Sequence, residues 1–172
     1  MPFRPHRAFS RPIPLPMPNV PGLRSPYEKI GRLVYFGRML DKIRLHSLGR
    51  LPADYIDNLG DSKPGMFDAR CCGFLRLSYA DIKRRTLEGG SDEEVLEWAE
   101  KRGARRSDDE CAVWNAFMMK RGWRDAPEVV QRLHRRVAEG GFGDKPIETY
   151  FDFIDYDEGR DPVSAKAWEK AC

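Results

Sequence analysis

The chain has 172 residues, of which 41% are hydrophobic and 33% charged, and its formal net charge is +3 at pH 7. This length and composition are typical of one globular domain with a substantial core. No apolar run approaches the roughly 20 residues of a membrane helix, and no charged start is followed by an apolar stretch. We therefore expect a cytoplasmic protein with no membrane contact.

The excess positive charge is concentrated in residues 1–21. This segment holds three of the 30 basic residues and no acid, which leaves 27 basic against 27 acidic side chains in the remainder. A neutral body disfavours nucleic acid as a partner. The segment also has seven prolines, which remove backbone donors and helical freedom. We predict a disordered tail over 1–21, a helical domain over 22–160 and a C-terminal tail over 161–172.

The stretch from Ser25 to Gly49 is predicted to be one long central helix. Ser25 and Glu28 have the spacing of a capping box, Pro26 suits the first helical position, and Gly49 suits the end. Such a helix would be roughly 34 Å long. Apolar residues cover about half of its circumference, so this helix should be packed against other segments on more than one side. These residues are Ile30, Leu33, Val34, Phe36, Leu40, Ile43 and Leu48.

The sequence is less regular between residues 51 and 77. A short helix should begin at Pro52, and a glycine-containing loop should follow up to Gly65. Residues 67–77 show neither helical nor strand periodicity around Gly73. We expect an irregular connector there, partly buried by its Phe and Leu residues.

One helix pattern then recurs. Ser78, Ser91 and Ser107 each precede an acidic residue by three positions, which is typical of a helix N-terminus, and glycines follow each predicted helix. The helix after Ser107 should bury one stripe of side chains: Val113, Trp114, Phe117 and Met118.

Two more helices are predicted, from about 127 to 139 and within 149–159. No convincing run of paired strands is found. The predicted fold class is therefore all-α, a compact single-domain bundle of about six or seven helices around the long central helix.

Asp41 and Arg44 are the sharpest candidates for a site, because they lie three residues apart inside the apolar sector of the central helix. A charge in a core is costly unless it is paired or faces a cavity. One interpretation is a buried ion pair joined to the connector that contains Asp68 and Arg70. The other is a small-molecule pocket whose floor is formed by Asp41 and Arg44.

No pattern indicates a metal or cofactor. The cysteines and histidines lack zinc-site spacing, and adjacent Cys71 and Cys72 seldom pair with each other. The acidic run Glu148–Asp161 lacks the spacing of a calcium loop. We expect reduced cysteines, no metal and no cofactor. The basic clusters, among them Arg132–Arg136, fall at helix C-termini, where the helix dipole favours them.

Five segments of the chain form a specific combination: GLRSPYEKIGRLVYFGRMLDKIRLH, FDARCC, SDEEVLEW, VWNAFMMKRGW and TYFDFIDYDEGR. With them the sequence resembles an uncharacterised family of bacterial proteins, domain of unknown function 5069, over about Gly22 to Arg160. The resemblance implies a compact helical domain in a bacterial cytoplasm and supplies no site residues.

These observations favour a soluble ligand-binding or protein-interaction module without catalytic chemistry. The alternative is a small enzyme whose pocket is built from Asp41, Arg44 and residues 68–72. The sequence does not distinguish three kinds of partner: a small molecule, another protein, or a second copy of the chain.

Overall fold

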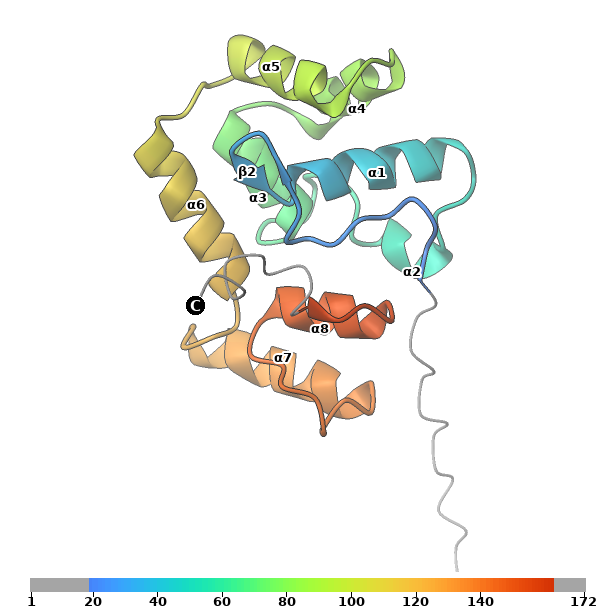
Figure 1. The fold of residues 1–172 in the computed structure, drawn as a ribbon, viewed down its shortest axis with the longest axis vertical. Helices are drawn as coiled ribbons and strands as arrows, with labels where there is room; N and C mark the ends of the chain where they lie inside the picture. The colour runs from blue at the N-terminus through green and yellow to red at the C-terminus, as the bar shows by residue number, and fades with distance from the viewer. Residues whose placement is uncertain (1–18, 163–172) are drawn as a thin grey trace, which may run out of the picture.

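Residues 19–162 are described by a computed structural model, and most of them lie in helices. The all-α class is confirmed, with one small hairpin beside eight helices in this range. None of these helices is long and apolar enough to cross a membrane. Figure 1 shows α4 and α5 at one end, α1 to α3 in the middle, and α7 and α8 at the other end, with α6 running along one edge. The elements are β1 Lys29–Ile30, β2 Leu33–Val34, α1 Phe36–Ser47, α2 Ala53–Ile56, α3 Phe67–Leu75, α4 Tyr79–Leu87, α5 Asp92–Arg102, α6 Asp108–Lys120, α7 Pro127–Glu139 and α8 Tyr150–Asp157.

The first part of the predicted central helix is wrong, because residues 25–35 form a turn and a hairpin. β1 and β2 pair antiparallel, and Gly31 makes the turn between them with φ +53°. The apparent capping box is used locally: the Ser25 N–H donates to Glu28 Oε1 (3.3 Å) and the Glu28 N–H donates to the Ser25 carbonyl (3.2 Å). Helix α1 begins only at Phe36.

Helix α1 nevertheless supplies the core. Phe36, Met39, Leu40 and Ile43 are fully buried in the main hydrophobic cluster, and Gly49 follows the helix with φ +66° as predicted. Leu48, predicted to face the core, is 64% exposed. The core is therefore organised around a helix of 12 residues and the hairpin before it.

The predicted connector over 67–77 is also wrong, because residues 67–75 form α3. Cys71, Cys72 and Leu75 of this helix are buried in the main cluster. No side chain caps its start at Met66. Since local signals are weak, packing against the core accounts for the helix, as tertiary contacts often override propensity.

Helices α4, α5 and α6 begin at the predicted serines, and Ser91 and Ser107 both form complete capping boxes. The buried face of α6 differs from the predicted stripe. Val113 is 70% exposed and Phe117 is 40% exposed, although Trp114 and Met118 are buried. Asn115 explains this rotation, because its side chain accepts from the Val34 N–H (3.0 Å) and donates to the Arg32 carbonyl (2.7 Å). This contact turns Asn115 towards the hairpin.

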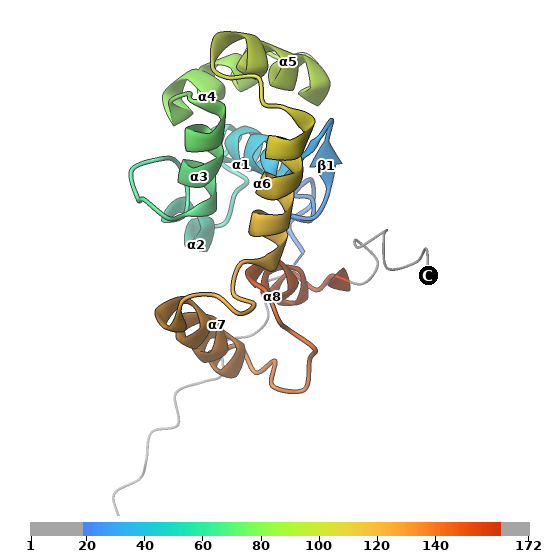
Figure 2. The ribbon, with the colours of Figure 1, turned by 90° about the vertical axis from the view of Figure 1, so that its left-hand side faces the viewer.

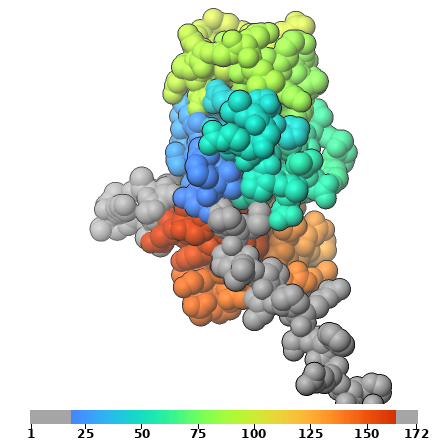
Figure 3. Space-filling model, turned by 90° about the vertical axis from the view of Figure 1, so that its right-hand side faces the viewer, coloured from blue at the N-terminus to red at the C-terminus, as the bar shows by residue number. Residues whose placement is uncertain are grey.

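Helices α7 and α8 form a layer of their own with a second cluster around Leu133, Phe142 and Phe153. Both were predicted, and Thr149 caps α8 with a capping box. Residues 20–28, the N-terminal segment of the described chain, link this layer to the middle of the molecule. In Figure 3 they lie between α1 and α8. Ser25 Oγ donates to Asp155 (2.6 Å), and the Tyr27 hydroxyl donates to Asp152 (2.7 Å).

Val20 belongs to the folded body although the predicted tail extends to residue 21. It is buried in a small cluster with Leu23, Leu45, Leu51 and Tyr55. Residues 1–18 and 163–172 of the two predicted tails lie outside the described residues.

Candidate functional site

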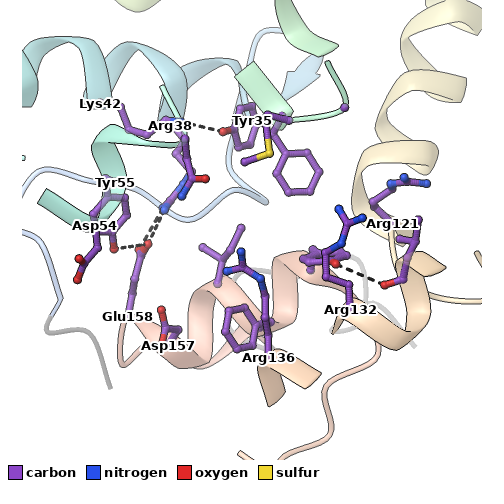
Figure 4. A pocket seen from close by; sticks show the side chains of 18 residues that line it. Tyr35, Arg38, Lys42, Asp54, Tyr55, Arg121, Arg132, Arg136, Asp157 and Glu158 are labelled. Carbon is purple, nitrogen blue, oxygen red and sulfur yellow. Dashed lines mark hydrogen bonds and ion pairs between the residues drawn. The ribbon is translucent and has the colours of Figure 1, made fainter. Parts of the chain in front are cut away.

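A cavity of about 270 Å³ lies between the α7–α8 layer and the middle of the molecule (Figure 4). One side of it is formed by α1, α2 and the residues just before α3. The other side is formed by the end of α6, by α7 and by α8. Its lining combines aromatic and aliphatic side chains with five basic and three acidic residues. The lining residues are Tyr35, Arg38, Lys42, Asp54, Tyr55, Asn58, Gly65, Met66, Phe67, Arg121, Val129, Arg132, Arg136, Tyr150, Phe153, Ile154, Asp157 and Glu158.

Arg38 and Glu158 form a buried ion pair that joins α1 to the end of α8 across the cavity. The two terminal nitrogens of the Arg38 guanidinium donate to the carboxylate, one of them at 3.0 Å, and the Tyr55 hydroxyl donates to it at 2.7 Å. Arg160 also contacts Glu158. Burial raises the pKa of Glu158, but the Arg38 and Arg160 guanidiniums outweigh burial and hold that pKa below its ordinary value. Glu158 therefore stays ionised and committed to its partners.

Lys42 lies one helical turn from Arg38 on the same wall. Its ammonium donates to Asp68 Oδ1 (2.6 Å) and to the Tyr35 hydroxyl (3.0 Å), while the Tyr35 hydroxyl donates to Asp68 (2.9 Å). Burial lowers the pKa of Lys42, and Asp68 opposes this by favouring the ammonium. Burial and the adjacent Asp68 carboxylate raise the pKa of Tyr35, so its hydroxyl stays protonated and acts as a hydrogen-bond donor.

The opposite wall combines apolar surface with arginines that rise from the lower layer. Arg121 is paired with Asp125 (2.6 Å). The side chains of Arg132 and Arg136 are exposed at the cavity, and neither makes an ion pair or hydrogen bond to any residue within 19–162. They lie four residues apart on α7 and therefore on one face of it.

The arrangement is suited to binding an anion with an apolar body. Arg38 and Lys42 are each paired with a carboxylate, whereas Arg132 and Arg136 have donors with no partner among residues 19–162. Phe67, Phe153 and Ile154 offer apolar contact beside them. Among the described residues no group of three His, Cys, Asp or Glu side chains is placed to hold a metal ion.

Asp41 and Arg44 do not line this cavity. Asp41 is held mainly by Arg24, whose Nε donates to Oδ2 at 2.6 Å, and the nearest Asp41–Arg44 approach is 3.9 Å. Arg44 instead pairs with Asp92 at the start of α5 (2.7 Å), as does Arg24 (2.6 Å). The result is a four-residue network that ties the N-terminal segment and α1 to α5.

Asp68 and Arg70 point in different directions and are not brought together with Asp41 and Arg44. Asp68 lies behind the cavity wall as the partner of Lys42. Arg70 donates to the Gly65 carbonyl (3.0 Å), and its guanidinium lies over the Phe117 ring, 5.1 Å from its centre. Neither residue lines the cavity, but each contacts residues that do: Asp68 contacts Tyr35 and Lys42, and Arg70 contacts Gly65.

Sequence reasoning missed Arg38, Lys42, Arg132, Arg136 and Glu158. The sequence signal for the two arginines is their four-residue spacing, which the helix dipole also explains. The pairing of Arg38 with Glu158 spans 120 residues and has no local signal.

Cys71, Cys72 and Cys111 are free and buried. Burial raises the pKa of the Cys72 thiol to about 12 and that of Cys71 well above its ordinary value, so neither is an activated nucleophile.

A comparison with protein families matches residues 20–160 to the Domain of unknown function (DUF5069). A comparison with curated proteins finds no match to the chain.

Proposed function

The chain belongs to the family of the Domain of unknown function (DUF5069), and from its own geometry we propose that it binds a small organic anion in the cavity between α1 and α7–α8. The ligand carries a carboxylate or phosphate group on an apolar, ring-sized body. The protein acts as a binding module, and the bound molecule is not changed by it.

The observation that carries this proposal is the free state of two arginines at the cavity. Arg132 and Arg136 are exposed to solvent at the cavity, whereas the more buried Arg38, Lys42 and Arg121 each have a carboxylate partner. Arg132 and Arg136 have none among residues 19–162, and Figure 4 shows both side chains reaching from α7 toward the cavity. Guanidinium groups bind carboxylate and phosphate oxygens in pairs. These two exposed guanidinium groups are therefore the donors at the cavity that are available to a ligand anion.

The size and lining of the cavity agree with a small ligand. A volume of about 270 Å³ is close to the lower end of ligand pockets in general. Met66, Phe67, Phe153 and Ile154 give apolar contact, which contributes about 25 cal/mol for each Å² removed from water. The anion would be fixed at the arginines and its body in the apolar part.

A non-catalytic role is favoured because the inner-wall groups are occupied. Glu158 accepts from Arg38, Arg160 and Tyr55, and Lys42 is held by Asp68. The second candidate function is a small enzyme, and one observation favours it: Lys42, Asp68 and Tyr35 form a proton-sharing group at the cavity wall. In that case Lys42, which lines the cavity, would exchange a proton with the ligand, and Asp68 behind it would stabilise the ammonium form.

Native mass spectrometry of the protein purified from its own cells tests the proposal. We expect a bound small anion, and we expect Arg132→Gln/Arg136→Gln to lose it. Losing charge-assisted hydrogen bonds of about 1.5–3 kcal/mol should weaken binding by roughly tenfold to a hundredfold. Arg135→Gln is the matched control, since Arg135 lies on α7 but does not line the cavity.

Equal retention of the ligand by both variants, or no anion among bound molecules, would contradict the proposal. The enzyme is distinguished by incubating the identified ligand with wild type and with Lys42→Met. Conversion of the ligand by wild type alone would favour the second candidate.

A further inference from the structure

Helix α6 exposes an apolar face that the described segments leave largely open, although the Arg70 guanidinium lies over one side of it, at the Phe117 ring. Val113, Phe117 and Trp123 are half of the large hydrophobic side chains exposed within residues 19–162. All three lie on α6 or directly after it. Figure 1 and Figure 2 both show α6 on the outside of the molecule. Exposed apolar side chains that gather on one face mark an interaction surface more often than scattered ones do.

The face has a regular composition. Asp109, Val113, Ala116 and Lys120 follow one another at intervals of four, three and four residues, so they form one line along the helix. Phe117 and Ala112 lie on the two sides of this line. The buried side chains of α6 lie on the opposite side of the helix.

The charges at the two ends of the line are unpaired within the described chain. Asp109 makes no ion pair with any residue of 19–162, whereas its neighbours Asp108 and Glu110 pair with arginines. Lys120 likewise makes no ion pair in that range, and its ammonium lies 5.9 Å from the centre of the Trp123 ring. The helix therefore presents an acid at its start, a base at its end and apolar residues between them.

We propose that this face binds the same face of a second copy of the chain, with the two α6 helices antiparallel across a two-fold axis. In this arrangement Asp109 faces the partner subunit's Lys120, and the reciprocal ion pair forms at the other end. Val113 then lies opposite the partner subunit's Ala116. A large side chain meets a small one at this position, which allows the helices to approach to about 8–10 Å.

Self-complementarity singles out a second copy among other partners. A two-fold interface requires that each residue and its counterpart be complementary in both directions. The line of α6 meets this condition for charge at Asp109 and Lys120 and for size at Val113 and Ala116. A nucleic acid would match the basic end but would be repelled at Asp109, and a uniformly acidic protein surface would meet the same repulsion.

The contact is expected to be weak. Helix α6 has 13 residues, and packing one face of it against a second copy would bury no more than about 1,200 Å² of surface in total, which is the lower limit for stable specific complexes. The dimer should therefore form reversibly with rising protein concentration. Its two terminal ion pairs are exposed, so salt should weaken it.

Sedimentation equilibrium of the full chain over a concentration series tests the proposal. We expect a monomer–dimer equilibrium for wild type. Asp109→Lys and Lys120→Glu should each weaken it by about tenfold or more, since each places like charges opposite one another at both ends. The double variant Asp109→Lys/Lys120→Glu restores both pairs with reversed sign, and its dissociation constant should return to within about threefold of wild type.

Val113→Glu should abolish the dimer, and Leu87→Glu is its control because Leu87 is an exposed apolar residue on α4. Circular dichroism of each variant verifies the fold. A wild type that stays monomeric at its solubility limit would overturn the proposal. So would a double variant that is as weak as the two single ones, or a dimer that Leu87→Glu disrupts and Val113→Glu does not.

Discussion

The buried pair of Lys42 and Asp68 behind the cavity should be strongly coupled in stability. Its atoms are 2.6 Å apart, and the Asp68 side chain is fully buried while that of Lys42 is 4% exposed. Asp68→Ala would leave the ammonium with the Tyr35 hydroxyl as its remaining acceptor. Removing one partner of a buried pair costs about 3–5 kcal/mol, and such a loss lowers the thermal midpoint by roughly 10 °C in a domain of this size.

Replacing the other partner, Lys42, should lower the free energy of unfolding less than Asp68→Ala does. Lys42→Met leaves Asp68 with two donors, the Tyr35 hydroxyl at 2.9 Å and the Gly60 N–H at 3.1 Å. We expect a loss of about 1–3 kcal/mol for this change. The double variant Lys42→Met/Asp68→Leu removes both charges and should be milder than Asp68→Ala alone.

Urea unfolding of the variants, with a double-mutant cycle, measures the coupling. The exposed pair of Lys101 and Glu97 serves as the control, because it has a comparable 2.7 Å contact at the surface. Glu97→Ala should barely change the midpoint. If Asp68→Ala proves no more costly than Lys42→Met, or if the two effects are additive, the argument for a desolvated pair fails.

Two further predictions concern the hairpin and the acid sensitivity of the cavity wall. Gly31→Ala should lower the free energy of unfolding, measured in urea, by about 1–2 kcal/mol, because Gly31 has φ +53° and an added Cβ would lie 2.9 Å from Leu96. If residues 25–49 formed the long helix that the sequence predicts, the same substitution would raise the free energy of unfolding by about 0.5–1 kcal/mol. The pKa of Glu158 is below its ordinary 4.5 in the folded state, so its contribution is complete above pH 4.5 and is lost as pH falls below that value. The urea midpoint of Glu158→Gln should therefore fall less steeply with acid than that of wild type, and parallel profiles would contradict this.

The elements that sequence alone predicted well are those whose signals are local. The helices after Ser91, Ser107 and Thr149 each begin with a capping box, in which the side chain and the acid three residues later satisfy each other's backbone donors. This motif needs no distant partner. It therefore predicts a helix start wherever the rest of the chain permits one.

The same motif failed at Ser25 because a distant contact decides the structure there. Glu28 reaches the Ser25 N–H as in a capping box, but the chain continues into a turn. Val34 then donates its N–H to Asn115, 81 residues away, which favours the hairpin over a helix. Helix α3 failed for a related reason, since burial by its neighbours stabilises it without an amphipathic pattern.

The cavity could not be predicted because its walls are far apart in the chain. Arg38 and Glu158 meet across 120 residues, and Asp68 meets Lys42 across 26. Sequence reasoning did identify Asp41 and Arg44 as charges that need partners, and it offered the segment of Asp68 and Arg70 to supply them. In the structure Arg24 pairs with Asp41, and Asp92 pairs with Arg44. Sequence reasoning could not identify these partners, because many charged residues were equally available.

The cavity depends on the contacts that join the two layers of the molecule. Arg38 ties α1 to the end of α8 through Glu158, and Tyr27 ties the N-terminal segment to the start of α8 through Asp152. Between these ties the layers meet along the cavity, so its apolar surface stays accessible to a ligand. A molecule that fills this space contacts both layers and is bound only while they are together. Ligand binding should therefore stabilise the whole domain against unfolding, by an amount that grows with ligand concentration over its dissociation constant.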